Sequence, residues 1–275
     1  MKKSLNAWSV DSALSFEEMF AAVSKAGFDG IELNVDKNGG AHALSMETTD
    51  EELAQIRELS EKYSLPVVSI STSQSNGMSG MPEKWDEYRA LLRKQIHIAK
   101  SLGATGILTA PGGNGDTITL KTARENTIRF FKEMKAEIEE LGIYVGLENV
   151  WNGFFLSPYD MVSMFEEIGS EKIGAYFDAG NMLAFSISEH WTEVLGKWIG
   201  FVHVKDYKRK GGLNCGGTWE EIPHGSGEWK KIIPALRAAG FDGYLTGEVF
   251  KSDPEMTYEA YYAKVASEIG EIITY

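Results

Sequence analysis

The stretch Ala26-Gly27-Phe28-Asp29-Gly30 occurs again, residue for residue, as Ala239-Gly240-Phe241-Asp242-Gly243. In both places a segment with the apolar spacing of a helix ends at the first glycine, and an apolar run of strand length begins near the second. Two identical junctions from a helix into a strand, one near each end of the sequence, indicate that the chain repeats a βα unit along its length.

Eight short runs rich in apolar and β-branched residues fit this repeat, with helical segments between them. The predicted strands are 5–8, 30–35, 67–71, 106–110, 144–149, 173–178, 200–206 and 244–249. Ser15 with Glu18, and Thr49 with Glu52, have the spacing of capping boxes at helix starts. Eight buried strands, each followed by a helix, predict an α/β fold of the (β/α)8 or TIM barrel class, with residues 1–275 as a single domain.

An open, doubly wound sheet is the competing arrangement of such units. Its dinucleotide-binding form has a G-x-G-x-x-G turn after the first strand, where this sequence has Ala7-Trp8-Ser9-Val10. The sequence has no Walker A motif either. These observations favour the closed barrel.

The composition is that of an ordinary globular protein, and it excludes several functions. The 275 residues include 27 Lys and Arg against 40 Asp and Glu, which gives a net charge of −13. An acidic surface repels phosphate backbones, so no nucleic-acid partner is expected. The single cysteine, Cys215, excludes a disulfide framework within the chain. Because no long apolar run or signal-peptide pattern occurs, we expect a cytoplasmic protein with no membrane partner.

Polar residues stand at the ends of four of the late predicted strands. They are Glu148, Asp178, His203 and Glu248. Since the strands of a barrel all end at one rim, we expect these side chains to converge. Three carboxylates brought together without a cation would repel one another into protonation, and a divalent ion removes that conflict. A set of mostly oxygen ligands with one imidazole suits Mn²⁺, with Co²⁺, Mg²⁺ and Zn²⁺ as alternatives.

Several segments of the sequence resemble the xylose-isomerase-like barrel superfamily of sugar and sugar-phosphate isomerases and epimerases. The resemblance extends over the whole chain, and its motifs are Glu148-Asn149, 176–181, 203–206, 223–229 and Gly247-Glu248. Within the superfamily, the pattern is most similar to ketose 3-epimerases of the D-tagatose/D-psicose type and to L-ribulose-5-phosphate 3-epimerase.

This resemblance implies a metal-dependent isomerase that acts on a sugar or a sugar phosphate. Glu148, Asp178, His203 and Glu248 would hold one divalent ion. The two glutamates would also be the acid/base pair of a 3-epimerase that works through a cis-enediolate. Such a reaction removes a proton from one face of C3 and returns one to the other, so it needs a proton-transfer group on each face. Members of this kind are commonly homodimers or homotetramers, and we expect the same here.

Four further residues are predicted to contact the substrate. Arg209 matches an arginine that contacts substrate oxygens in the tagatose-type enzymes, and Trp8 would form an apolar wall for a sugar face. Asn181 stands where those enzymes usually have a histidine, which brings the chain closer to the sugar-phosphate branch. Lys205 begins a basic cluster that runs to Lys210. That cluster could bind a phosphate or form a solvated loop.

Related activities are alternatives at this stage. An aldose–ketose isomerase or a hydroxypyruvate isomerase would use the same enediol chemistry. A lyase or dehydratase on a keto-sugar or keto-inositol would begin with the same proton abstraction. Abasic-site endonucleases share the fold but need further histidines, where this chain has residues such as Thr109 and Asn181. A sugar-binding module without activity would have no use for two acid/base carboxylates.

The remaining ionisable residues carry weaker predictions. His97 and His190 fall in helical segments and are expected to be structural. His42 follows the second predicted strand and could reach the site, and Glu32 lies within that strand as a partner of a site residue or as a buried cap. The role of His224 is left open.

Overall fold

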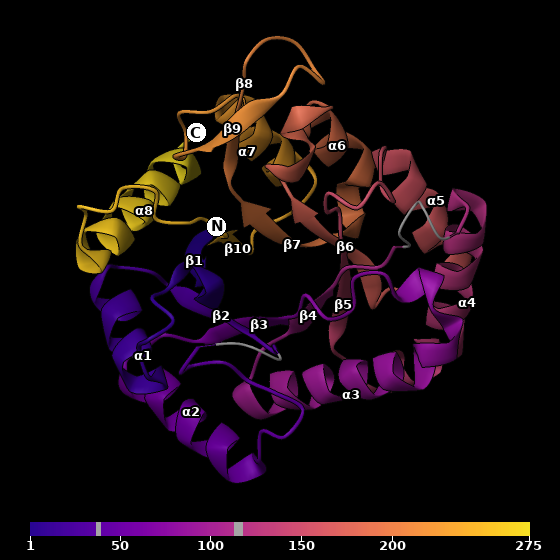
Figure 1. The fold of residues 1–275 in the computed structure, drawn as a ribbon, viewed down its shortest axis with the longest axis horizontal. Helices are drawn as coiled ribbons and strands as arrows, with labels where there is room; N and C mark the ends of the chain where they lie inside the picture. Colours follow the sequence, from indigo (N-terminus) through magenta and orange to yellow (C-terminus); the bar gives the residue numbers. More distant parts are fainter. Residues whose placement is uncertain (37–39, 113–117) are drawn as a thin grey trace.

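Parallel strand pairing closes on itself around the centre of the molecule. The computed structural model describes residues 1–36, 40–112 and 118–275, and Figure 1 shows their helices arranged around the strands. The order of strands in the barrel is β1-β2-β3-β4-β5-β6-β7-β10, and β10 pairs with β1 to close it. The predicted fold class is confirmed. No helix in the described ranges has the length and apolar character needed to span a membrane.

Each barrel strand is followed by a helix, as the repeated junctions predict. The strands are β1 (Lys2–Asn6), β2 (Gly30–Asn34), β3 (Val67–Ser71), β4 (Gly106–Thr109), β5 (Tyr144–Glu148), β6 (Ile173–Asp178), β7 (Ile199–Val204) and β10 (Tyr244–Gly247). The helices are α1 (Phe16–Lys25), α2 (Asp50–Lys62), α3 (Trp85–Leu102), α4 (Leu120–Leu141), α5 (Pro158–Ile168), α6 (Ser188–Leu195), α7 (Trp229–Ala238) and α8 (Tyr258–Ile273). Both predicted capping boxes are present, at the starts of α1 and α2.

The prediction for the first strand is wrong in its boundaries. β1 ends at Asn6, whose side-chain oxygen accepts a hydrogen bond from the Trp8 amide at 2.7 Å. This bond caps the short 3-10 helix η1 (Ala7–Ser9), so the chain turns where the sequence predicts continued strand. Trp8 therefore lies in a turn beyond the strand.

The prediction of a single strand over 200–206 is also wrong. β7 ends at Val204, and Asp206 begins an antiparallel hairpin of β8 (Asp206–Arg209) and β9 (Gly217–Glu220) outside the barrel. The Asp206 carboxylate accepts hydrogen bonds from the amides of Gly225 and Gly227 and from the Trp229 indole, which fixes the direction of the chain. The sequence did not predict this hairpin because a glycine-rich segment separates its two short strands.

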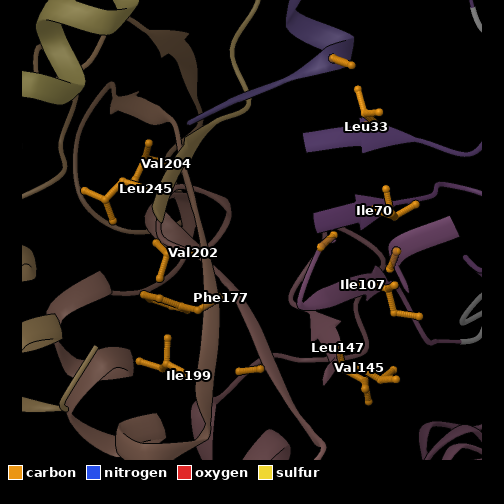
Figure 2. Close-up of a cluster of buried hydrophobic side chains, with 14 of the residues drawn as sticks. Leu33, Ile70, Ile107, Val145, Leu147, Phe177, Ile199, Val202, Val204 and Leu245 are labelled. Carbon is orange, nitrogen blue, oxygen red and sulfur yellow. The ribbon is translucent and has the colours of Figure 1, made fainter. Parts of the chain in front are cut away.

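Apolar side chains on the outward side of the strands pack against the surrounding helices. Figure 2 shows part of this layer, including Leu33, Ile70, Ile107 and Val202, all of them fully buried. Because side chains alternate along a strand, Glu32 points to the opposite side from Leu33, into the barrel. The interior at that level is polar, and it positions the site described below.

Two large aromatic rings fill the barrel near the starts of its strands. The Tyr144 and Phe201 rings lie 5.9 Å apart, and the Tyr144 hydroxyl donates to the Trp198 carbonyl. Glycines make room for these rings. A Cβ atom added to Gly106 would lie only 2.1 Å from the Phe201 ring, and one added to Gly174 would lie 2.0 Å from the Tyr144 hydroxyl.

We expect Gly106→Ala to destabilise the fold by about 1–3 kcal/mol, because overpacking a filled core forces side chains and backbone to shift. The measurement is the midpoint of urea unfolding. Gly212→Ala is the matched control, since a Cβ atom there meets no atom within 4 Å. Equal midpoints for the two variants would contradict this account of the core.

Candidate metal centre

The structure brings together the four residues that the sequence placed at strand ends. Glu148 is the last residue of β5, Asp178 the last of β6, His203 lies in β7, and Glu248 directly follows β10. One ligand atom from each lies within 4.8 Å of the others. Asp178 and His203 are fully buried, and Glu148 is nearly so. The cluster therefore stands at the end of the barrel where active sites of this fold are found.

The imidazole of His203 is oriented by a carboxylate inside the barrel. Its Nε2 lies 2.7 Å from Glu32 Oε1, and its Nδ1 lies 3.1 Å from Glu148 Oε1 and 3.4 Å from Glu248 Oε2. When Nε2–H donates to Glu32, the lone pair of Nδ1 faces the other carboxylates. This is the arrangement in which a carboxylate fixes the tautomer of a metal-binding histidine.

Three more polar groups hold Glu32. The hydroxyls of Ser69 and Tyr176 and the side-chain amide of Asn6 all donate to its carboxylate. Burial opposes the charge of Glu32, but attraction to His203 and these hydrogen bonds outweigh it and lower the pKa of the carboxyl. Glu32 is thus a buried anion whose partners are in place before any ligand binds. The sequence predicted a partner role for Glu32 but missed Ser69 and Tyr176.

One carboxylate oxygen of Asp178 is fixed and the other is left open. Oδ1 accepts hydrogen bonds from the backbone amides of Gly180 and Asn181, both at 2.8 Å. Oδ2 is buried and accepts no hydrogen bond within the described residues. Its nearest charge is Lys205 Nζ, at 2.9 Å, which makes an ion pair without hydrogen-bond geometry. A buried carboxylate oxygen without a donor is an observation that fits a cation ligand.

Lys205 lies among the acidic residues of the cluster. Its Nζ is 2.6 Å from Glu248 Oε2, and it stands 5.4 Å from the centre of the Trp219 ring. Burial acts to lower the pKa of Lys205, but Asp178 and Glu248 outweigh it and raise the pKa. The ammonium group is therefore a permanent donor at the rim of the site.

The two glutamates of the cluster differ in their electrostatic surroundings. Burial raises the pKa of Glu148 to about 7. Burial also opposes the charge of Glu248, but the adjacent Lys205 and His203 outweigh it and lower the pKa of Glu248. One carboxyl is therefore easy to protonate and the other is held as an anion.

Two of the predicted substrate contacts are engaged in hydrogen bonds to the backbone. The Arg209 guanidinium donates to the carbonyl of Leu183, at 2.9 Å, and to that of Ser186. The Asn181 amide donates to the carbonyl of Asn149, also at 2.9 Å. Both side chains therefore support the loops around the rim. The residues of the predicted basic cluster have separate environments. Lys205 pairs with Glu248, Arg209 donates to the Leu183 carbonyl, and Lys208 is exposed.

Two of the histidines outside the cluster, His42 and His97, have structural contacts. Both ring nitrogens of His42 face backbone carbonyls, those of Leu14 and Ala7, at 2.8 and 3.2 Å. His42 therefore links η1 to the segment that precedes α1. His97 contacts Asp50 at the surface.

His224 lies in a second group of potential ligands, with Glu221 and Glu268. Lys264 forms ion pairs with both of these glutamates, so a cation already offsets the charge of the group. This group is a salt-bridge cluster without the open ligand atom found at Asp178.

An aromatic wall that the sequence did not predict stands beside the cluster. Trp151, in the loop after β5, stacks on Trp219 of β9 with ring centres 5.0 Å apart and planes at 27°. Tyr207 of β8 meets both rings edge-on. Both tryptophans are about half exposed. Trp8, the wall predicted from sequence, lies half-buried in η1.

Residues 20–267 match the family model of the xylose isomerase-like TIM barrel. The chain belongs to this family. A comparison with curated proteins gives no match.

Solved structures of several other proteins share the fold over nearly the full chain. A D-psicose 3-epimerase determined in the presence of D-fructose has a TM-score of 0.73 at 18% identity and covers 99% of this chain and 96% of its own. The IOLI protein with a bound zinc atom has a TM-score of 0.79 at 15% identity, with 100% and 98% covered. The 3-keto-D-glucoside 4-epimerase YcjR of E. coli has a TM-score of 0.73 at 16% identity, with 100% of each chain covered. At these identities the likeness establishes a common fold.

Proposed function

We propose that the protein is a divalent-metal-dependent epimerase of keto-sugars. The observation that carries this proposal is the convergence of Glu148, Asp178 and Glu248 on Nδ1 of His203 at the rim of the barrel. Membership of the xylose isomerase-like family supports it. Two of the structural neighbours, the D-psicose 3-epimerase and the 3-keto-D-glucoside 4-epimerase, also support it.

The cluster fits a divalent cation. Asp178 Oδ2 has no hydrogen-bond donor among the described residues, and Glu32 leaves Nδ1 of His203 facing the carboxylates. Glu148, Asp178, His203 and Glu248 would hold the ion, and Mn²⁺ suits their donor set. A bound ion would supply Lewis-acid stabilisation of the negative charge that develops on the substrate oxygens.

The chain's own residues would transfer the proton. Glu148 and Glu248 come from strands that are separated in the barrel by β6 and β7, so we assign one to remove the proton beside the ketone and the other to return a proton to the opposite face. Lys205, which already donates to Glu248, would hydrogen-bond to a substrate oxygen at the same rim. We also propose that Arg209, Asn181 and Trp8 contact the sugar.

The test is isotope incorporation in D₂O with Mn²⁺, using a panel of ketoses, ketose phosphates and keto-glycosides. For a ketose or a ketose phosphate we expect deuterium at C3 and inversion of C3, and for a keto-glycoside we expect deuterium and inversion at a stereocentre next to the ketone. Detection by NMR separates the competing reactions. Deuterium at C1 or C2 of a ketose or its aldose product would instead show an aldose–ketose isomerase, and loss of water or of a leaving group would show a lyase. Either result would contradict the proposed epimerisation.

A further inference from the structure

A cavity of about 330 Å³ adjoins the metal centre on one side. Its walls come from β9, the loop after β10 and α8. Lys205 and Glu248 form its border with the metal centre, whereas Glu148, Asp178 and His203 do not line it. The cavity therefore extends away from the ion-binding residues. Its volume lies at the lower end of the range of about 300–1,000 Å³ for sites that bind drug-sized molecules.

The walls of this cavity are mainly apolar. Side chains from three separate segments of the chain contribute, and they include Trp219, Ile222, Val249, Phe250, Met256 and Val265. Trp219 belongs to the aromatic wall and also lies beside Lys205, so the same ring borders the rim of the metal centre and the cavity. An apolar group attached to a sugar at the metal centre would enter the cavity directly.

A hydroxyl group in the cavity wall lacks a partner. Tyr261 lines the cavity and is only 6% exposed, and its hydroxyl has no hydrogen-bond partner among the described residues. The neighbouring Tyr262 differs, because its hydroxyl accepts the Asp11 amide at 2.9 Å. Buried polar groups are normally paired, so the Tyr261 hydroxyl points to a hydrogen-bonding group on a ligand.

The charges around the cavity disfavour a phosphate. Six acidic residues line it against three lysines, and the acidic ones are Asp206, Glu220, Glu221, Glu248, Asp253 and Glu268. Lys205 and Lys264 are already paired with acidic residues of this same set. A dianionic ligand would therefore meet an excess of negative charge.

We propose that this cavity is a subsite for an uncharged, ring-sized apolar substituent on the sugar, such as the aryl aglycone of a keto-glycoside. Its edge would carry a hydroxyl or similar group that bonds to Tyr261. The inference rests on the proposed function, because the sugar itself must sit at the metal centre. The substrate class is then a glycoside-like keto-sugar in preference to a free ketose or a ketose phosphate.

The test compares methyl and 4-hydroxyphenyl 3-keto-β-D-glucopyranoside as substrates of the Mn²⁺-loaded protein. We expect kcat/KM for deuterium incorporation to be about 10- to 100-fold higher for the aryl compound, which is the effect of burying one aromatic ring. Met256→Trp, at a half-buried position in the wall, should remove this preference, because the larger ring fills the cavity. Met256→Leu, which nearly conserves the volume, should retain the preference.

A second pair of variants tests the hydroxyl. Tyr261→Phe should lower the preference for the 4-hydroxyphenyl compound over the phenyl compound by about tenfold or less, the range for one hydrogen bond. Tyr258→Phe removes a hydroxyl from the same helix at a residue outside the cavity, and it should change nothing. Equal kcat/KM for the 4-hydroxyphenyl and phenyl compounds in the wild type and in both variants would overturn the role of Tyr261.

Failure of the subsite and failure of the proposed function give different results. Equal kcat/KM for the methyl and aryl compounds would overturn the subsite and leave the epimerase standing. If no sugar incorporates deuterium, the proposed function fails. Calorimetry with methyl and 4-hydroxyphenyl β-D-glucopyranoside then tests the subsite. Tighter binding of the aryl compound, with loss of this difference in Met256→Trp, would support the subsite. Equal binding of the two compounds would overturn the subsite.

Discussion

Replacing Glu148 by glutamine is expected to lower the rate of deuterium incorporation by about 10²- to 10⁴-fold, the usual contribution of a positioned proton-transfer group. Glutamine keeps the size of the side chain and an oxygen that can face the ion, but it cannot accept the substrate proton. The nearly complete burial of Glu148 also leaves little room for a water molecule to replace it. The measurement is the single-turnover rate of exchange at saturating Mn²⁺.

Asp178→Asn is the matched control for Glu148→Gln. Both residues are buried ligands of the cluster, but only Glu148 is assigned to proton transfer. We expect Asp178→Asn to weaken Mn²⁺ binding and to recover most of the exchange rate when the ion is saturating. Glu148→Gln should not recover. If both variants recover alike at high Mn²⁺, Glu148 is a ligand only and the proposed proton transfer is wrong.

Glu32→Gln is expected to weaken Mn²⁺ binding by about 10- to 100-fold, although Glu32 is not itself a proposed ligand. The Glu32 carboxylate lies 2.7 Å from Nε2 of His203 and fixes which nitrogen faces the cluster. The glutamine amide would offer a donor to groups that are themselves donors, namely the hydroxyls of Ser69 and Tyr176. The imidazole would lose both its orientation and the negative charge behind it.

Isothermal calorimetry with Mn²⁺ measures this effect, and circular dichroism checks that the variant is folded. Glu58→Gln, on the exposed face of α2, is the control for loss of one negative charge. A folded Glu32→Gln protein with the Mn²⁺ affinity of the wild type would show that the network around Glu32 is structural only.

The four proposed ligands could be predicted from sequence because of a simple geometric property of the fold. Parallel strands of a closed barrel all end at one rim, so the position of Glu148, Asp178 or Glu248 at the end of a strand is enough to place it. Recognising the eight strands from the sequence pattern was therefore enough to predict that the four proposed ligands lie together. Small errors in strand boundaries did not matter, because Glu248 reaches the cluster even though β10 ends at Gly247.

The groups that support the cluster could not be predicted in the same way. Tyr176 lies inside β6 and meets Glu32 from 144 residues away in the sequence. Alternation along a strand indicates that both residues face inward, but it does not say which inward residues meet across the barrel. The sequence signal for these supporting groups is a polar residue at an inward-facing strand position, such as Glu32 or Ser69.

The Trp151–Trp219 wall and the adjoining cavity were missed for a different reason. Trp219 reaches the rim only because the chain after β7 forms the β8–β9 hairpin. That hairpin depends on hydrogen bonds from distant residues, such as Gly227 and Trp229, to Asp206. Sequence pattern within the short strands themselves contains little of this information.

The most direct test of the account is a crystal structure of the protein grown with Mn²⁺, with the ion located by its anomalous scattering. We predict one peak bounded by Glu148, Asp178, Nδ1 of His203 and Glu248, and a weaker peak in Asp178→Asn at a Mn²⁺ concentration that does not saturate the variant. A peak only at Glu221, His224 and Glu268, or no peak at a saturating concentration of Mn²⁺, would contradict the proposed metal centre and the chemistry built on it.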